Sequence, residues 1–222
     1  MNKRSLQRVG TVFTILGAAI TVCAAVLYVY LYFDDLRAGR SADFAVEQIS
    51  AHVVETPQEL TADPAGSPAA GPAGDPAAET ADPTFAVDGV EYLGYISFTG
   101  YEKKLPVIAD WDFESLETAP VRYVGSFADD NIVIAGHNYR SHFYLLHSLV
   151  VGNEIVFTDP VGNETHYLVA ETETLRPTDI DEMCSGGWDM TLFTCTTGGR
   201  ARFAVRCEKK TFYPADEVWR QG

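Results

Sequence analysis

The chain has 222 residues, which suits one domain of ordinary size with additional segments and is short for two full domains. Acidic residues outnumber basic ones by 31 to 16, so the protein repels phosphate backbones, and nucleic acid is not expected as a partner.

Residues 9–33 form an uncharged, strongly apolar stretch. As a helix it would extend roughly 38 Å, enough to cross a hydrocarbon core about 30 Å thick. Basic residues precede it and Asp34 and Asp35 follow it, which predicts a cytoplasmic N-terminus and an extracellular remainder. A cleaved secretory signal is the alternative, but its apolar region is usually only about 7–15 residues long. We therefore expect residues 1–35 to be a cytoplasmic tip and an uncleaved single-pass membrane anchor.

Residues 36–84 are predicted to be an extracellular linker. The first part, residues 36–52, is compatible with a short helix that continues beyond the membrane. Residues 55–84 are rich in Ala, Pro, Gly and acidic side chains and hold too few large apolar residues to form a core. Such a segment stays extended, so it should hold the following domain away from the bilayer.

Residues 85–222 have the pattern of an all-β domain. Seven or eight short strand-like runs are separated by turn residues, among them YLGYISF, LPVIAD, NIVIAG, EIVFT and MTLFTC. Helical patterns occur at residues 110–120 and at residues 141–149, where Ser141 is available as an N-cap. So many strands with so few helical residues favour a closed barrel or a sandwich over a doubly wound sheet.

Cys195 ends one of these strands, and the turn TTGGRA follows it. A thiol at a strand end is accessible, which a nucleophile requires. Arg200 and Arg202 lie across the turn, and a nearby guanidinium favours a thiolate or a developing oxyanion. From this segment alone, Cys195 is either a nucleophile or a small apolar residue in the core.

His137 ends the apolar run NIVIAG. Gly136 before it lets backbone or a ligand approach closely. Histidine carries protons near neutral pH and is the natural partner of a cysteine nucleophile. A histidine at a strand end can equally be structural or merely solvated.

The other cysteines and histidines are given no catalytic role. Cys23 lies in the apolar stretch, and Cys184 and Cys207 are free to form a disulfide outside the cell, although the sequence does not show whether they meet. No C-x-x-C or H-x-x-x-H pair is present, so we predict neither a metal nor another cofactor. The remaining histidines are expected at the surface: His52, His142, His147 and His166.

Taken together, these motifs resemble those of sortases, the cysteine transpeptidases of Gram-positive cell surfaces. TLFTCTTGGRARFAV is similar to their T-L-x-T-C signature with the arginine that opens the last strand, and IVIAGHNYR is similar to their histidine motif. The resemblance covers about residues 88–210 and implies a closed β-barrel of roughly eight strands with one or two short helices. An N-terminal anchor and linker fit the usual layout of the family.

The resemblance implies a role for each motif residue. Cys195 would be the nucleophile and His137 the general acid and base. Arg202 would orient substrate carbonyls and stabilise the oxyanion, with Arg200 as the competing candidate because residues 196–201 form a shorter loop than is usual in the family. Thr194 and the backbone N–H of Thr196 would support the substrate or the oxyanion.

The implied reaction cleaves a C-terminal sorting signal similar to Leu-Pro-x-Thr-Gly on a surface protein or pilin, through a thioester on Cys195. The acyl group then passes to an amine, either of a peptidoglycan cross-bridge or of a pilin lysine. The spacing from His137 to Cys195 leaves little room for the long helical insertion of class B. We therefore expect a compact class D-like or a divergent class B-like sortase.

Two other functions stay open. One is an exported cysteine hydrolase or protease that uses water as the acceptor. The other is a non-enzymatic extracellular β-domain that binds peptide or glycan, in which Cys195 would be inert. An L,D-transpeptidase is disfavoured because its cysteine normally follows a glycine in a motif that this chain lacks.

Overall fold

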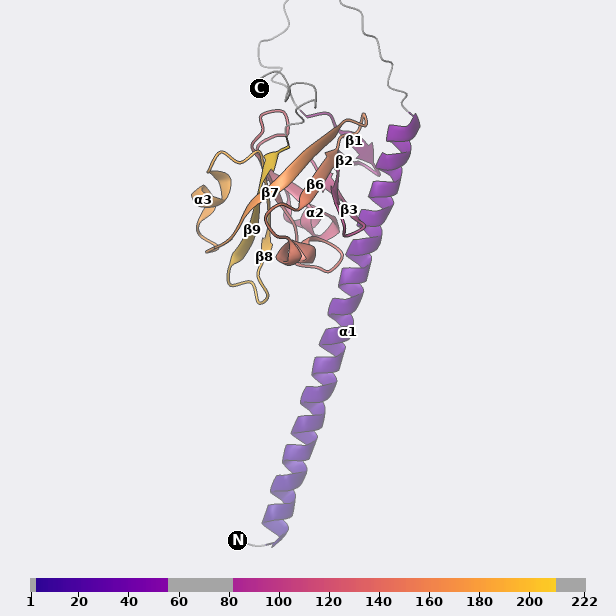
Figure 1. Cartoon of the computed structure of the whole chain (residues 1–222). Helices are drawn as coiled ribbons and strands as arrows, with labels where there is room; N and C mark the ends of the chain where they lie inside the picture. The colour runs from indigo at the N-terminus through magenta and orange to yellow at the C-terminus, as the bar shows by residue number, and fades with distance from the viewer. Residues whose placement is uncertain (1–2, 56–81, 211–222) are drawn as a thin grey trace, which may run out of the picture.

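The computed structural model describes residues 3–55 and 82–210, in which a long helix lies beside a β-barrel (Figure 1). The helices are α1 (Lys3–Glu55), α2 (Phe113–Thr118), the 3-10 helix η1 (Phe143–Ser148) and α3 (Ile180–Cys184). The strands are β1 (Phe85–Val87), β2 (Val90–Phe98), β3 (Lys103–Ile108), β4 (Val121–Val124), β5 (Ile132–Ala135), β6 (Glu154–Thr158), β7 (Glu164–Leu175), β8 (Met190–Cys195) and β9 (Arg202–Lys209).

The sheet closes on itself through one additional strand pairing. Its order is β1-β2-β3-β4-β5-β8-β9-β7-β6, and β6 also pairs with β2. Strands β2 to β9 therefore form a closed ring of eight. β1 pairs with the first residues of β2, and β6 pairs with the last ones. This confirms the predicted closed barrel of about eight strands and excludes the sandwich. The described barrel carries three short helices, α2, η1 and α3, where one or two were expected.

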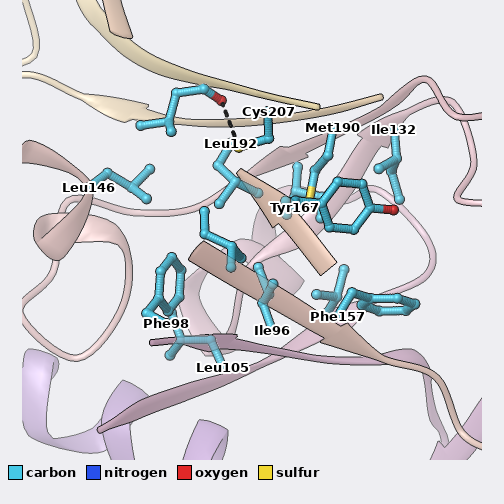
Figure 2. Packing of buried hydrophobic residues seen from close by; sticks show 14 of the residues in the cluster. Ile96, Phe98, Leu105, Ile132, Leu146, Phe157, Tyr167, Met190, Leu192 and Cys207 are labelled. Carbon is cyan, nitrogen blue, oxygen red and sulfur yellow. Dashed lines mark hydrogen bonds between the residues drawn. The ribbon is translucent and has the colours of Figure 1, made fainter. Parts of the chain in front are cut away.

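The barrel interior is filled by large apolar side chains, which point inward from alternate positions along the strands. Figure 2 shows part of this cluster, with Ile96 and Phe98 of β2 facing Met190 and Leu192 of β8. Cys207 is buried in the same cluster. All four residues of β5 are buried. Ile132 and Ile134 face this core, and on the other face Val133 packs in an apolar cluster with Met183 of α3.

α1 is long and apolar enough, by length and composition, to cross a membrane. Its N-terminal part projects away from the barrel, and its C-terminal part lies along β1, β2 and β3 (Figure 1). Ala45 and Ile49 of α1 are buried in a second apolar cluster with residues of β1 to β4. After residue 36 the helix therefore continues and packs on the barrel, as the suggested helical continuation anticipated, and the division into anchor, linker and barrel domain stays a prediction.

The rest of the predicted linker is described only at its end. Residues 56–81 lie outside the described residues, so their linker role stays a prediction. The Asp82 carboxylate is buried and accepts hydrogen bonds from the backbone N–H groups of Phe127 and Ala128 (3.0 and 2.9 Å). The chain is therefore fastened to the barrel before β1 begins.

The two predicted helices are shorter in the structure than in the sequence pattern. Asp112 caps α2 and accepts a hydrogen bond from the Ser115 N–H (2.7 Å). The second helix is the 3-10 helix η1, and His142 rather than Ser141 occupies its N-cap position. The predicted cap Ser141 instead binds α1, because its N–H and hydroxyl both donate to Asp35.

Candidate active site

Parallel pairing of β5 and β8 brings His137 and Cys195 to the same end of the barrel. Ala135 pairs with Phe193, and the Gly136 N–H donates to the Phe193 carbonyl at 3.1 Å. Two residues further along each strand stand His137 and Cys195. Because the carboxyl ends of adjacent parallel strands share one edge, residues far apart in sequence meet there.

The β8–β9 hairpin places Arg202 directly opposite Cys195. Side chains opposite each other on an antiparallel pair point to the same face, with Cβ atoms about 5 Å apart. Gly198 and Gly199 turn the chain at positive φ (87° and 71°), a conformation that favours glycine. This geometry explains why a cysteine, a Gly-Gly turn and an arginine occur together in the sequence.

The three side chains line one pocket of about 350 Å³ on the outer face of the barrel. Its floor is formed by β4, β5 and β8. Aromatic and aliphatic side chains from the segment between β3 and β4 form one wall, and the connection from β7 to β8 forms the other. The lining residues include Trp111, Phe113, Leu116, Tyr123, Arg176, Ile180 and Met183.

The structure separates the two candidate arginines. Arg202 lines the pocket and its Nη1 lies near the carbonyls of Gly199 and Ala201 (3.5 and 3.4 Å). Arg200 is exposed in the turn and stands outside the set of residues that line the pocket. The geometry therefore favours Arg202.

The predicted supporting residues fit the expectation less well. The Thr196 N–H donates to the Ala201 carbonyl (3.0 Å), so in this conformation the hairpin uses the hydrogen that was expected to stabilise an oxyanion. Thr194 borders the pocket, but the residue is only 1% exposed, and its hydroxyl has no hydrogen-bond partner among the described residues. The space left by Gly136 is filled by the ring of Phe143, because a Cβ there would lie 2.5 Å from it.

His137 has an aromatic and acidic environment. Its ring stacks on Tyr139, with centroids 4.8 Å apart. Burial lowers the pKa of the His137 imidazole below its ordinary value, and the charges of Glu117 and Asp34 act in the opposite direction. Burial and a hydrogen bond to Asp34 raise the pKa of Tyr139 to about 12.

The other cysteines and histidines are not among the residues that line this pocket. All four cysteines are unpaired, with Cys184 exposed on α3 and Cys207 in the core, so the open question of a disulfide is answered against it in this structure. His142 is fully buried, which contradicts its expected surface position. Its Nε2 lies 3.1 Å from the Thr118 carbonyl, so it belongs to the packing between η1 and α2.

Several residues next to His137 or in the pocket wall carried no clear signal in the sequence. Tyr139 lies two positions after His137, and a wider reading of IVIAGHNYR could have included it. Asp34, which accepts its hydroxyl hydrogen bond (3.0 Å), is remote in sequence and was assigned only to the membrane flank. The pocket wall at α3 was missed because this helix has only five residues.

A thiol, an imidazole and a guanidinium on one pocket can together perform acyl transfer. The thiolate can attack an acyl carbon, the imidazole can move protons, and the cation can stabilise negative charge on the carbonyl oxygen.

Comparison with known proteins identifies the family. A model of the sortase domain matches residues 96–210. Sortase C1 from Streptococcus agalactiae is similar at 26% identity and a TM-score of 0.50, over 58% of this chain and 72% of that chain. Sortase D5 transpeptidase from Clostridium perfringens has 23% identity and a TM-score of 0.49, over 54% and 79% of the two chains. Sortase A from Corynebacterium diphtheriae has 23% identity and a TM-score of 0.48, over 58% of this chain and 65% of that chain.

No curated protein sequence matches the chain. The family match spans more than half of the residues, and the chain belongs to the sortase family of cysteine transpeptidases. The family model does not distinguish subclasses, so the subclass stays a prediction.

Proposed function

We propose that this protein is a membrane-anchored sortase that joins surface proteins or pilins to an amine through a thioester on Cys195. The observation that carries this proposal is the arrangement of Cys195, His137 and Arg202 around one pocket. Membership of the sortase family supports it independently.

In the first half-reaction, the Cys195 thiolate attacks the threonine carbonyl of a Leu-Pro-x-Thr-Gly-like signal. The carbonyl oxygen becomes negative in the tetrahedral intermediate, and Arg202 stabilises it. As the C–N bond breaks, protonated His137 gives its proton to the departing glycine amine. A thioester remains on Cys195.

In the second half-reaction, an amine from a cell-wall cross-bridge or a lysine attacks the thioester. His137 takes the proton that this amine loses, and the Cys195 thiolate leaves. The product contains a new amide bond, and the enzyme returns to its starting state. Because both halves share one acyl-enzyme, ping-pong kinetics are expected.

The apolar pocket walls support an apolar segment before the scissile bond. Phe113 is 79% exposed and lies in T-shaped contact with Trp111, whose ring also contacts Tyr123. Exposed apolar side chains around a pocket are typical of ligand-binding sites. A Leu-Pro pair would cover this surface.

In this proposal α1 is the membrane anchor, and the basic residues before its apolar stretch favour a catalytic domain outside the cell. The apolar stretch ends at Phe33, and Asp34 and Asp35 directly after it already contact the barrel. Tyr28, Tyr30 and Tyr32 precede this point, as is common at a membrane interface. The pocket would then lie close to the bilayer surface, because little helix separates it from the apolar stretch.

Transfer of a peptide to an amine tests the proposal. The full chain in detergent micelles is incubated with Leu-Pro-x-Thr-Gly peptides, and the products are measured by mass spectrometry with and without triglycine. Cleavage at the threonine and a ligated triglycine product are expected, and Cys195→Ala should form neither.

Each other outcome overturns the proposal in a specific way. Cleavage without ligation at saturating triglycine would identify a hydrolase. Binding of the peptides without cleavage, together with an equal affinity in Cys195→Ala, would identify a non-enzymatic binding domain.

A further inference from the structure

The junction between the apolar stretch of α1 and the barrel is made by two consecutive carboxylates. Asp34 Oδ2 accepts a hydrogen bond from the Tyr139 hydroxyl (3.0 Å). Asp35 Oδ1 accepts from the N–H and the hydroxyl of Ser141 (3.0 and 2.7 Å). Both carboxylates thus hold the short loop that directly follows His137.

Small residues allow α1 to approach this loop closely. A Cβ on Gly39 would lie 3.0 Å from the Ser141 Cβ, which is tighter than ordinary contact. Ala38 and Ala42 on either side are buried. Glycine inside a helix costs about 1 kcal/mol relative to alanine, so its presence here fits a position where no side chain has room.

Tyr139 of this loop connects α1 to the His137 imidazole. Tyr139, whose hydroxyl is held by Asp34, stacks on the His137 ring at an interplanar angle of 28°. On the other side of the loop, the Phe143 N–H donates to the His137 carbonyl at 3.1 Å. The orientation of the imidazole is therefore tied to α1 through a single aromatic ring.

We propose that Asp34 and Tyr139 are positioning residues for His137, which makes the anchor helix part of the catalytic unit. The proposal rests on the transpeptidase function inferred for His137 above. Asp34 contacts no reacting atom and acts through Tyr139 and through its charge.

The charge of Asp34 is one of several around the imidazole. Glu117 of α2 and Asp34 of α1 both raise the pKa of His137, against the dominant effect of burial. His142 lies in the same loop, and Arg202 and the Cys195 thiol share the pocket with His137. Removal of the Asp34 charge should therefore lower the pKa of His137 further, because the imidazolium loses a favourable neighbour.

Kinetics of the full chain in lipid nanodiscs test the positioning role. Asp34→Ala and Tyr139→Phe should each lower kcat, by on the order of tenfold for Asp34→Ala, with KM within about twofold, because misorientation affects the chemical step more than binding. The double variant should be no slower than Asp34→Ala alone, since both changes remove the same hydrogen bond. Asp34→Glu should recover part of the rate.

Glu47→Gln is the matched control. It removes one carboxylate from the exposed face of the same helix and should leave kcat unchanged. Fully additive losses in the double variant, an effect on KM alone, or an equal loss in Glu47→Gln would each overturn the proposal.

A titration that needs no turnover separates this proposal from the function itself. The His137 imidazole resonance of the full chain is followed by NMR against pH and is assigned by its loss in His137→Gln. Asp34→Asn should shift the His137 midpoint to lower pH, whereas Glu47→Gln should not. An unchanged midpoint in Asp34→Asn contradicts the proposed coupling even if the enzyme is active, and the expected shift would support it even if no peptide is cleaved.

Discussion

Cys195 and Arg202 face each other across the β8–β9 ladder, and His137 reaches them from a strand that is remote in sequence. Each of these residues stands at a strand end, where backbone pairing fixes its position and the side chain still reaches solvent. The turn between Cys195 and Arg202 is held by a mutual pair of hydrogen bonds between Thr196 and Ala201. The guanidinium is therefore placed by the hairpin itself.

The two arginines of the hairpin provide a matched test at this scale. Arg202→Ala should lower kcat by about 10²-fold or more, because a cation placed at a developing oxyanion contributes mainly in the transition state. The kcat of Arg200→Ala should stay within about twofold of the wild-type value, since the Arg200 side chain is exposed in the turn. Steady-state kinetics of peptide cleavage check both values, and a larger loss in Arg200→Ala would reverse the assignment.

The residues of the pocket were largely predictable because their chemistry shows in local patterns. A strand-end cysteine, a Gly-Gly turn, an arginine and a strand-end histidine were all visible in the sequence. The hydrogen-bond partner of the Thr196 N–H could not be predicted, because it depends on how the turn closes. The burial of His142 was equally hidden, since a polar residue between two helical patterns carries no sign of what will pack on it.

At the scale of elements, Arg206 fastens the short helix α3 to β9. Its side chain is 2% exposed, and its guanidinium donates to the carbonyls of Met183 and Glu182 (2.6 and 2.7 Å). It also pairs with Glu173 (2.6 Å). α3 has only five residues and would not be stable alone, so this buried arginine holds one wall of the pocket in place.

Replacement of Arg206 by methionine should lower the free energy of unfolding by about 3 kcal/mol, because it leaves buried carbonyls and Glu173 without their partner. Amide hydrogen exchange should become faster in residues 180–184 before it does in β8. Chemical denaturation and exchange mass spectrometry check these effects. Arg200→Met, which changes an exposed arginine, is the control. An equally large loss of unfolding free energy in Arg200→Met would contradict this account.

Buried His142 should make the protein sensitive to mild acid. Burial lowers the pKa of His142 to about 4, from a model-compound value near 6.5. Between these two pH values His142 is protonated in the unfolded chain but neutral in the folded chain. The free energy of unfolding therefore decreases as the pH falls from about 6.5 towards 4. The loss amounts to at most about 3 kcal/mol.

The unfolding midpoint at pH 7 and at pH 5 checks this effect. His142→Gln keeps an amide donor for the Thr118 carbonyl and should lose less stability between the two pH values than wild type does. His147→Gln, at an exposed position of the same 3-10 helix, should behave like wild type. An equal pH dependence in wild type and His142→Gln would contradict the assignment.

Short elements were the least predictable part of the fold. The long alternating or continuous apolar runs were identified as strands, whereas β1, β4 and α3 have only three, four and five residues and were not. β1 and β4 form by pairing with neighbouring strands and α3 by its contacts with Arg206, rather than by local propensity. The closure of the barrel was predictable as a class, but the β2–β6 pairing that completes it was not.

At the scale of the whole molecule, α1 and the barrel form one packed unit. Ile49 is fully buried and shares an apolar cluster with Tyr92, Tyr95 and Val121 of the barrel. The sequence indicated a linker from residue 36 that is helical at first and extended from residue 55, because composition alone cannot show that a helix has a barrel to pack on. α1 is therefore packed beside the barrel, while the linker role of residues 56–81 stays a prediction.

A fragment that begins at residue 82 should be less stable than one that begins at residue 34, because it exposes the surface that α1 covers. The single change Ile49→Ala in the longer fragment should cost about 2–5 kcal/mol, as is typical of a large-to-small substitution in a core. Thermal melting of the two fragments checks the effect of α1. Equal melting temperatures would show that the helix contributes nothing to the fold.

The most direct test of the central claim is the mass of the intact full-chain protein after brief incubation with a Leu-Pro-x-Thr-Gly peptide. We expect an acyl adduct that maps to Cys195, is lost on addition of triglycine or hydroxylamine, and is absent in His137→Ala. An adduct on another residue, or its undiminished formation in His137→Ala, would contradict the claim that these side chains form one catalytic site.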